Sequence, residues 1–568
     1  MKRLFFFFLM LGFAFSVKSQ TQYPQDYFRS PLELRILLSG TFGELRSDHF
    51  HTGIDIKTRG VEGVWVFAAA EGYVSRVKVS PFGTGKTIYL THPNGYVSVY
   101  GHLSRFEDSL AQFVQQEQYA RQSFSVDLFP KKDQFHYAKG QLIAYSGNSG
   151  SSGGPHLHFE IRDERTQEPI NPLLFGIQVK DFIRPTIQSV RVYPEAKKPF
   201  SLELAGWGEN YRLKAGDTIG LPKRFYLGIN TIDKQNDTKN NNGVFEVDLF
   251  LDSVQVYGNR QERLNFSTGR YINAFIDYAY YYTFKRRYQK AYVGEQNKLD
   301  IYTKVKNKGW INLSDDAIHK IRYQVKDANG NVSVLSFYCF RDNETKFESW
   351  AEDTQKKAVF YPDQQNVYQS NKFKLVVPVN ALYDTMNFHF DELPANKTTY
   401  TPIYRIGRKQ VPLQSYIQLS ITLDSFPESI KSKLLMADID QGRLATSELR
   451  WDKNRATASI RSFGDYALVA DTIAPQIKWI QPPKNADGQQ INKLSFIIKD
   501  DLSGIESYSA YLNGKWVLFE YDAKNNLIFH YPSGLIDKNI LKISVVDRVG
   551  NTSKFERTFD KTLRLSAK

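Results

Sequence analysis

The stretch that decides the fold of the N-terminal part is Gly154-Pro155-His156-Leu157-His158-Phe159-Glu160. After the proline, the residues alternate as in a half-buried strand. His156 and His158 then share one face, about 7 Å apart at Cα, while Leu157 and Phe159 point into a core. Two imidazoles at this spacing can converge on a metal ion and its water. The alternative is a pair of histidines on a solvated strand face.

An earlier stretch, His51-Thr52-Gly53-Ile54-Asp55, offers one nitrogen and one oxygen ligand. In a straight strand, His51 and Asp55 would lie roughly 13 Å apart, too far for one metal. Gly53 permits a bend that would bring them together. Alone, the pair also fits a surface histidine and a turn aspartate. With one histidine of the later pair, it gives two histidines and a carboxylate, which suits zinc with one position open for water.

Seven of the ten histidines fall within residues 49–158, so we expect any chemistry near the N-terminus: His49, His51, His92, His102, His136, His156 and His158. In the stretch Tyr100-Gly101-His102-Leu103, His102 ends a strand that begins after the turn Asn94-Gly95. His92 lies on the other side of that turn, about 20 Å away, and we predict a structural role for it. His49 either lies near the candidate metal site or is exposed to solvent, and we predict no role for His136.

The histidine-rich segment has the pattern of an antiparallel β unit. Residues 73–79, 87–91 and 96–100 are strand candidates, with a hairpin turn at Asn94-Gly95. Apolar residues at helical spacing predict an inserted helix from about Glu107 to Arg121. The sheet resumes near Gln141.

Two other catalytic motifs are excluded. No His-Glu dipeptide occurs in the sequence, so the helical His-Glu-x-x-His zinc site is absent. Residues 150–154 match Gly-x-Ser-x-Gly, but that serine elbow requires a following helix. Here Pro155 and a strand follow, so we expect flexible glycines that lead into the His-x-His strand.

The three histidine stretches, in this order, resemble the lysostaphin-type (LytM-like) zinc metallopeptidases, which cut peptide cross-links in bacterial cell walls. The resemblance covers roughly Gly40 to Phe175 and implies a small antiparallel β-sheet domain with a groove across the sheet. It implies that His51, Asp55 and His158 are zinc ligands. It further implies that His102 and His156 are catalytic histidines. The inserted helix departs from the compact family pattern, so the shape of the groove and the preferred peptide stay open.

The implied mechanism is hydrolysis of peptidoglycan peptides by a zinc-activated water. Either His102 or His156 acts as general base and the other stabilises the oxyanion, an assignment that the sequence leaves open. A non-catalytic wall-binding module that activates another hydrolase is the alternative. Degenerate relatives of that kind typically lack ligands, whereas all five positions are filled here, which favours the enzyme.

Residues Met1–Ser19 read as a signal peptide, with Lys2 and Arg3 before an apolar run that is short for a membrane span. We expect the mature chain to start at Gln20 and to be exported, periplasmic or extracellular and associated with the cell envelope, without a transmembrane anchor. Cleavage would lower the formal net charge from +14 to +11. A basic exported chain suits anionic cell-envelope polymers, and nucleic acid is not expected as a partner.

Beyond Pro172, short alternating strands predict β-sandwich (Ig-like) modules in a mainly β chain. A weak repeat supports this: the frame Asp-x-x-Gly-Asn occurs at 327–331 and at 547–551, each downstream of a strand led by Pro185 or Pro475. Two unrelated hairpin turns are the alternative. We expect a signal peptide (1–19), a zinc peptidase domain with the helical insertion (20–176), a β-sandwich module with an insertion of about 70 residues (177–345), a β-rich module (346–470) and an Ig-like module (471–568).

The later modules look suited to binding or spacing. A tyrosine-rich stretch, 278–282, lies close to Arg286 and Arg287 and either stacks on sugars and holds anions or is an aromatic strand with a basic edge. The single cysteine, Cys339, excludes an intramolecular disulfide and is expected in the core.

Overall fold

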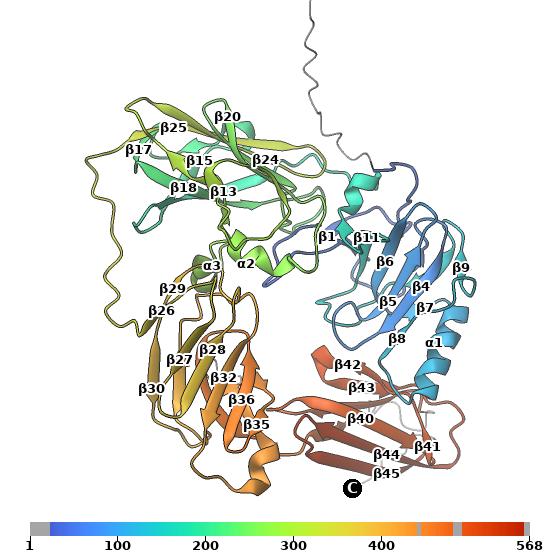
Figure 1. The fold of residues 1–568 in the computed structure, drawn as a ribbon. Helices are drawn as coiled ribbons and strands as arrows, with labels where there is room; N and C mark the ends of the chain where they lie inside the picture. The colour runs from blue at the N-terminus through green and yellow to red at the C-terminus, as the bar shows by residue number, and fades with distance from the viewer. Residues whose placement is uncertain (1–22, 440–444, 481–490, 562–568) are drawn as a thin grey trace, which may run out of the picture.

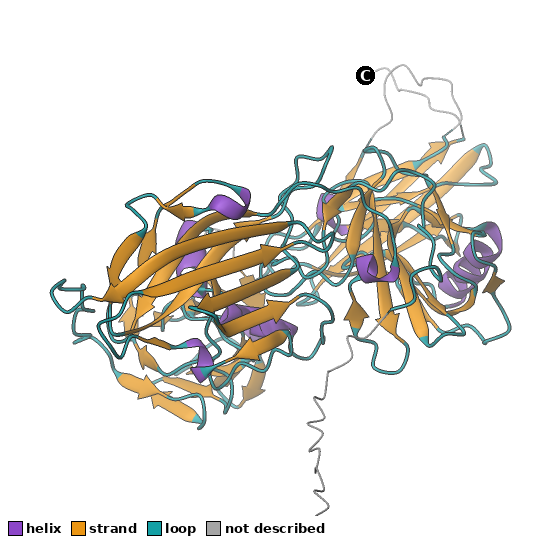
Figure 2. Ribbon diagram, turned by 90° about the horizontal axis from the view of Figure 1, so that it is seen from above, coloured by secondary structure: helices purple, strands orange, loops and turns teal. Residues whose placement is uncertain are grey.

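The computed structural model describes residues 23–439, 445–480 and 491–561. The expected signal peptide, Met1–Ser19, lies outside the described residues. The described residues form four units, each with its own apolar core, which we call the first, second, third and fourth unit. Strands dominate throughout (Figure 2), so the prediction of a mainly β chain, with β-rich domains after an N-terminal sheet domain, is confirmed.

The four units follow one another around a ring, so that the fourth unit lies beside the first (Figure 1). Lys86 of the first unit pairs with Glu520 of the fourth at 2.8 Å. The ring of Tyr119 meets Trp516 edge to face, with centroids 5.2 Å apart. The first and fourth units are therefore in contact, although 434 positions separate Lys86 from Glu520.

The first unit is built on an antiparallel sheet with the order β1-β2-β11-β6-β5-β4-β8, and a smaller sheet, β3-β10-β7, packs with it around one core. Its elements are β1 (Leu38–Gly40), β2 (Ile54–Lys57), β3 (Trp65–Phe67), β4 (Gly72–Val79), β5 (Lys86–Thr91), β6 (Tyr96–Leu103), β7 (Arg105–Phe106), α1 (Asp108–Ala120), β8 (Val126–Leu128), β9 (His136–Tyr137), β10 (Leu142–Tyr145), β11 (His156–Asp163) and β12 (Pro169–Ile170).

Local sequence explains two of these elements. The hairpin between β5 and β6 turns through Gly95, whose φ of +80° is readily adopted only by glycine. The inserted helix α1 begins after Glu107, whose carboxylate accepts the backbone N–H groups of Leu110 and Ser109 at 2.8 and 3.2 Å. Leu110 and Val114, four residues apart, bury one helix face in the core of the first unit.

The second unit has two main sheets, β14-β13-β18-β21 and β17-β25-β24-β19-β20-β22, whose inner faces share one core that includes Cys339, as expected. Its elements are β13 (Thr186–Pro194), β14 (Phe200–Leu202), β15 (Leu204–Ala205), β16 (Arg212–Leu213), β17 (Thr218–Leu221), β18 (Arg224–Ile232), β19 (Glu246–Leu251), β20 (Val254–Arg260), α2 (Ile272–Phe275), α3 (Tyr278–Phe284), β21 (Gln289–Lys290), β22 (Tyr302–Val305), β23 (Ile311–Asn312), β24 (His319–Lys326) and β25 (Val332–Arg341).

The third unit also packs two five-stranded sheets on one core, β27-β28-β32-β36-β35 and β30-β31-β37-β33-β34. Its strands are β26 (Ala358–Phe360), β27 (Asn366–Gln369), β28 (Phe373–Val377), β29 (Met386–Phe388), β30 (Phe390–Leu393), β31 (Ile403–Ile406), β32 (Ile417–Thr422), β33 (Leu434–Asp438), β34 (Ala445–Ser447), β35 (Arg450–Asp452), β36 (Arg455–Ile460) and β37 (Gly464–Ala470).

The fourth unit repeats the plan with two four-stranded sheets, β38-β39-β43-β42 and β41-β40-β44-β45. Its strands are β38 (Gln476–Trp479), β39 (Leu494–Lys499), β40 (Ile505–Leu512), β41 (Lys515–Trp516), β42 (Glu520–Asp522), β43 (Leu527–His530), β44 (Lys538–Asp547) and β45 (Thr552–Asp560). The searched part of the chain contains no helix that is both long and apolar enough to cross a membrane.

The two Asp-x-x-Gly-Asn frames occupy equivalent turns of the second and fourth units. Asp327 lies between β24 and β25 and Asp547 between β44 and β45, both antiparallel pairs. Each aspartate accepts the backbone N–H of the asparagine four residues later, Asn331 at 2.8 Å and Asn551 at 2.7 Å. The shared turn geometry favours an internal repeat over two unrelated turns.

Candidate metal and catalytic site

The register of the first sheet places the candidate site across β2, β11 and β6. Asp55 on β2 lies directly opposite His158 on β11, and His158 lies opposite Gly101 on β6, next to His102. A Cβ atom on Gly101 would come within 3.4 Å of the Cβ of His158, so a glycine here leaves room for the imidazole. Three strands from distant parts of the sequence therefore supply neighbouring side chains.

Three candidate ligand atoms converge. Asp55 Oδ1 lies 2.9 Å from His158 Nδ1 and 3.1 Å from His51 Nε2, and the two nitrogens are 3.2 Å apart. Tetrahedral zinc with ligands at about 2.0–2.1 Å separates its ligand atoms by about 3.3 Å. Because all three side chains are also buried, the group fits a metal ion.

The loop before β2 brings His51 into this group. Gly53 does not adopt a positive φ, so it serves close approach rather than a left-handed bend: a Cβ atom there would lie 2.4 Å from the carbonyl oxygen of Phe159. Phe50, next to His51, is buried against Phe275 of the second unit, with ring centroids 6.0 Å apart. The second unit thus supports the loop that carries His51.

Hydrogen bonds on the far side of each imidazole orient the two histidines of the group. His51 Nδ1–H donates to the carbonyl oxygen of Thr41 at 2.8 Å, which turns Nε2 toward Asp55. His158 Nε2 lies 2.8 Å from Glu160 Oε1 and donates to it. Glu160 is itself buried and paired with Arg162, and Arg46 contacts the second oxygen of Asp55 at 3.1 Å.

The charges of the group are strongly coupled. Burial raises the pKa of the Asp55 carboxyl, but the charge of His51 and hydrogen bonds from His156, His158 and His51 outweigh burial and hold the pKa well below its usual value. Burial lowers the pKa of His158, but hydrogen bonds to Asp55 and Glu160 outweigh it and raise the pKa to about 9. A metal ion would replace the proton that Asp55 and His158 share.

His102 and His156 lie beside the three ligands. Their ring centroids are 4.7 Å apart, and the ring of His102 is 5.9 Å from that of His158. His102 Nδ1–H donates to the carbonyl oxygen of Ser149, and His156 Nδ1–H to that of Gly154, both at 2.8 Å. Both rings therefore turn Nε2 away from these carbonyls, and His156 Nε2 lies 3.4 Å from Asp55 Oδ1. Burial and the charges of His158 and His156 lower the pKa of His102 to about 3.

The structure thus brings together all five residues that the sequence singled out, and it separates the other histidines from them. His92 is buried between the carbonyl of Glu71 and the hydroxyl of Ser98, a structural position. His49 is exposed and pairs with Asp48, so the solvated alternative holds for it. His136 is exposed on β9.

Sequence reasoning missed the residues that orient the ligands. Glu160 follows His158 by two positions on the same strand face, so the alternation that paired His156 with His158 could have included it. Thr41 and Ser149 contribute only backbone carbonyls, which no residue pattern reveals. Ser152, the serine of the Gly-x-Ser-x-Gly match, lies in a loop that leads into β11 without a helix, as expected.

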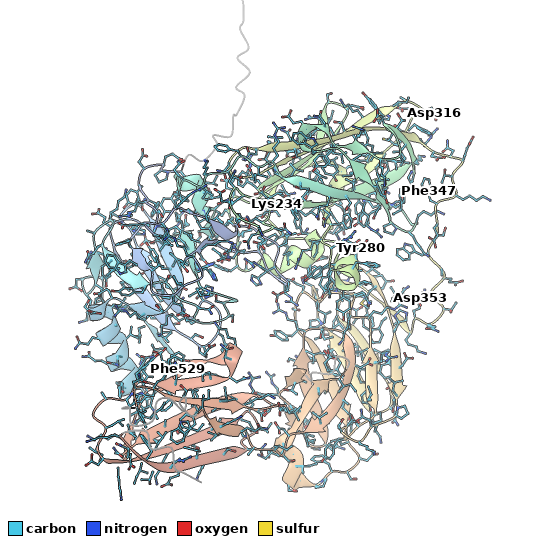
Figure 3. The ribbon with its side chains drawn as sticks, turned by 180° about the vertical axis from the view of Figure 1, so that it is seen from behind. Lys234, Tyr280, Asp316, Phe347, Asp353 and Phe529 are labelled. Carbon is cyan, nitrogen blue, oxygen red and sulfur yellow. The ribbon has the colours of Figure 1, made fainter. Side chains whose placement is uncertain are left out.

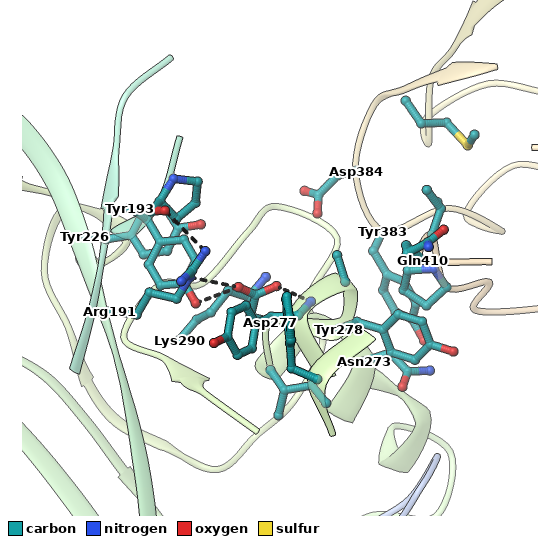
Figure 4. A pocket seen from close by; sticks show the side chains of 18 of the residues that line it. Arg191, Tyr193, Tyr226, Asn273, Asp277, Tyr278, Lys290, Tyr383, Asp384 and Gln410 are labelled. Atoms are coloured by element: carbon teal, nitrogen blue, oxygen red, sulfur yellow. Dashed lines mark hydrogen bonds and ion pairs between the residues drawn. The ribbon is translucent and has the colours of Figure 1, made fainter. Parts of the chain in front are cut away.

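The tyrosine stretch proves to be helical, so its interpretation as an aromatic strand is wrong. Asp277 caps α3 by accepting the backbone N–H of Tyr280 at 3.1 Å. Tyr278 and Tyr280 help line a cavity of about 480 Å³ between the second and third units. Other residues that line it, such as Arg191 and Tyr383, are labelled in Figure 4. Arg287 is engaged within the stretch itself, stacked on Tyr281 at 4.2 Å.

Comparison with known proteins agrees with this geometry. Residues 49–123 match the model of peptidase family M23, and residues 357–471 match that of a Zu5-like domain. An uncharacterized metalloprotease of Haemophilus influenzae is 30% identical over 159 residues, 27% of this chain and 28% of that protein. The DD-carboxypeptidase/endopeptidase Mpg of Neisseria meningitidis is 30% identical over 129 residues, 23% of each chain.

A third relative is the peptidoglycan DD-endopeptidase ShyC of Vibrio cholerae, 30% identical over 140 residues, 24% of this chain and 26% of that protein. The chain spans about a quarter of the length of these curated relatives. The match of residues 49–123, within the first unit, to the model of peptidase family M23 confirms the family resemblance that the motifs of this unit indicated.

Proposed function

We propose that this chain is a zinc-dependent endopeptidase that hydrolyses peptide cross-links of bacterial peptidoglycan. The observation that carries the proposal is the convergence of His51 Nε2, Asp55 Oδ1 and His158 Nδ1 within 3.2 Å of one another, with two further histidines beside them. Such a ligand set leaves one position of a tetrahedral ion free.

In this proposal His51, Asp55 and His158 hold the zinc. When bound, zinc acts as a Lewis acid that polarises a carbonyl and makes water a nucleophile at neutral pH. The chain holds the ligands in place: Thr41 and Glu160 fix the imidazole tautomers, and Arg46 occupies the remaining oxygen of Asp55.

His102 and His156 transfer the proton of the attacking water and stabilise the negative charge that develops on the carbonyl oxygen. Each keeps its Nδ1–H on a backbone carbonyl, so Nε2 is free to accept a proton from the attacking water. Once protonated, the same atom can pass the proton to the leaving amine. The neighbouring ring would stabilise the negative oxygen of the tetrahedral intermediate when its own Nε2 carries a proton, so that this N–H donates to the oxygen. Which histidine performs which step stays open.

Peptidoglycan is proposed as substrate because two of the matched relatives are named as peptidoglycan or DD-peptide hydrolases. A substrate in the cell wall requires export, which agrees with the signal-peptide pattern of Met1–Ser19 and places the mature chain in the periplasm or outside the cell. The basic charge suits anionic envelope polymers. We further propose the domain division 20–176, 177–345, 346–470 and 471–568, in which the later modules bind or space.

The test combines zinc analysis with digestion of purified peptidoglycan, followed by mass analysis of the fragments. His158→Ala should lose both the bound zinc and the cleavage, whereas His102→Ala should keep the zinc and lose about 10²–10⁴-fold in rate. His136→Ala, an exposed histidine outside the site, is the matched control and should behave as the wild type.

Two outcomes would contradict the proposal. A His158→Ala protein that still digests peptidoglycan would refute the ligand assignment. A wild-type protein that binds peptidoglycan and retains zinc but releases no fragments would favour the wall-binding module that activates another hydrolase.

A further inference from the structure

Three aspartates of the second unit form a buried cluster outside the peptidase site. Asp181 lies in the segment that leads from the first unit to β13, Asp233 directly follows β18, and Asp327 begins the turn between β24 and β25. One carboxylate oxygen of each lies within 4.8 Å of the others. Their exposed fractions are 5%, 2% and 4%. Lys234, the sequence neighbour of Asp233, marks the location in Figure 3.

This cluster brings three acidic groups together and includes buried oxygens without hydrogen-bond partners in the part of the chain that the structure describes. Among the described residues, no lysine, arginine or histidine forms an ion pair with Asp181, Asp233 or Asp327. Asp181 Oδ2 and Asp233 Oδ1 are buried and accept no hydrogen bond from the described part of the chain. The other oxygens do accept backbone N–H groups, such as Asp181 Oδ1 from Ile183 at 3.0 Å and Asp327 Oδ1 from Asn331 at 2.8 Å. Burying the unpartnered oxygens costs free energy unless a proton or a cation neutralises the cluster.

The electrostatics of the three groups agree with a missing cation. Burial, followed by the charges of Asp327 and Asp181, raises the pKa of Asp233 to about 9. Burial likewise raises the pKa of Asp181 to about 6 and raises that of Asp327. A divalent cation would offset the repulsion among the three carboxylates, which contributes to their raised pKa values.

The repeat in the fourth unit provides an internal comparison. Asp471, Asp500 and Asp547 form the corresponding cluster. In both units one aspartate precedes the first strand (β13 or β38), one follows the strand that pairs with it (β18 or β39), and one begins the Asp-x-x-Gly-Asn frame. Both clusters accept backbone N–H groups: in the copy, Asp471 accepts from Ser503 at 2.9 Å and Asp500 from Gly504 at 2.6 Å, and in the first cluster Asp181 accepts from Ile183 at 3.0 Å. Unpartnered buried oxygens occur, within the described chain, in the first cluster and not in its copy.

We propose that Asp181, Asp233 and Asp327 bind a hard divalent cation of the calcium class. An all-carboxylate set is the ligand chemistry of such ions rather than of zinc. Oxygens bound to one calcium ion at 2.3–2.6 Å lie at most about 5 Å apart, which the cluster satisfies. This site is separate from the proposed zinc site and does not depend on it.

The ion would fasten the segment between the first and second units. Two bonds already hold this segment to the Asp-x-x-Gly-Asn turn: Asn329 Nδ2 donates to the carbonyl of Val179 at 2.7 Å, and Asn331 Nδ2 to that of Asp181 at 3.2 Å. A cation shared by Asp181, Asp233 and Asp327 would add a third connection. It would thereby fix the orientation of the first unit relative to the second.

The test uses calcium chloride alone, added to the metal-free full chain. We expect millimolar calcium to slow hydrogen–deuterium exchange in residues 179–185 and 327–333 and to bind with measurable heat. Asp233→Asn should remove the change in exchange and weaken calcium binding at least tenfold. Asp316→Asn, an exposed aspartate labelled in Figure 3, is the matched control and should keep both.

Other variants separate the possible causes. Asp500→Asn, in the copy, should leave the calcium effect on residues 179–185 unchanged, and so should His158→Ala. Unchanged exchange in the wild type with calcium would overturn the proposal, and so would an Asp233→Asn protein that binds as the wild type does. If Asp233→Asn fails to fold, Asp181→Asn and the wild-type comparison with and without calcium decide the matter.

Discussion

Glu160 links the metal group to the interior of the first unit. Its Oε1 accepts from His158 at 2.8 Å and from the hydroxyl of Thr52 at 2.7 Å, and its other oxygen pairs with Arg162. Burial raises the pKa of Glu160, but the charge of Arg162 and the bond from His158 outweigh burial and lower it below its usual value. The carboxylate is therefore negative and holds His158 in one tautomer.

Glu160→Gln should weaken zinc binding. The amide can still accept from His158, but it lacks the charge that strengthens the bond and leaves Arg162 without its partner. We expect a 10–100-fold loss of zinc affinity, measured by competition with a chelator. The exposed Glu164→Gln is the control and should keep the wild-type affinity. Equal affinities for the two variants would show that Glu160 does not position the ligand.

At the scale of elements, the helix α1 depends on Glu107. The same carboxylate caps the helix and accepts the hydroxyl of the buried Tyr137 at 2.7 Å. Glu107→Ala should destabilise α1 by about 2 kcal/mol, because it removes a cap worth about 1 kcal/mol and leaves a buried hydroxyl unpaired. Hydrogen exchange of the α1 amides measures this.

The control for Glu107 is Glu117→Ala, which removes a surface pair with Arg121 worth about 0.3–0.5 kcal/mol. Its α1 amides should exchange nearly as in the wild type. If both variants exchange alike, the cap at Glu107 does not determine the stability of the helix.

Sequence patterns predicted those elements whose cause is local. The period-2 pattern of β11, the turn at Gly95 and the helical spacing of α1 each depend on residues within one element, and the structure contains all three. The tyrosine stretch failed because aromatic residues favour strands, whereas the cap at Asp277 and packing in the second unit make it a helix. Gly53 was predicted to bend, yet its role is an approach to β11, which is set by tertiary packing.

In the candidate site, too, features with a local cause could be predicted from the sequence, and features that depend on tertiary packing could not. The five positions could be named because histidines are few and clustered in this sequence, and because the three stretches, in this order, resemble the LytM-like peptidases. Glu160 and the carbonyls of Thr41 and Ser149 escaped because their roles arise only when β2, β6 and β11 are paired. The ring of Phe50 packs against that of Phe275, more than 200 positions away, and no local sequence pattern predicts such a contact.

At the scale of the whole molecule, the fourth unit closes the ring against the loops beside the peptidase site (Figure 1). Lys86 pairs with Glu520, and Lys524 donates to the carbonyl of Asn148, next to the Ser149 that orients His102. Because Lys86 and Glu520 form an ion pair in this contact, a charge reversal at one of them should loosen it.

Glu520→Lys should place two ammonium groups together and open this contact. We expect faster hydrogen exchange in residues 84–86 and 147–149 and a larger radius of gyration by small-angle X-ray scattering. Glu506→Lys makes the same charge change at an exposed position of β40 and should leave both measurements as in the wild type. Identical behaviour of the two variants would contradict closure through Glu520.

The most direct test of the proposed zinc site is X-ray absorption spectroscopy at the zinc edge, on the full chain loaded with one equivalent of zinc. The account predicts two imidazole nitrogens and light-atom ligands at about 2.0–2.1 Å in the first coordination sphere. A sphere of oxygen ligands without imidazole, as the aspartate cluster would give, would contradict it.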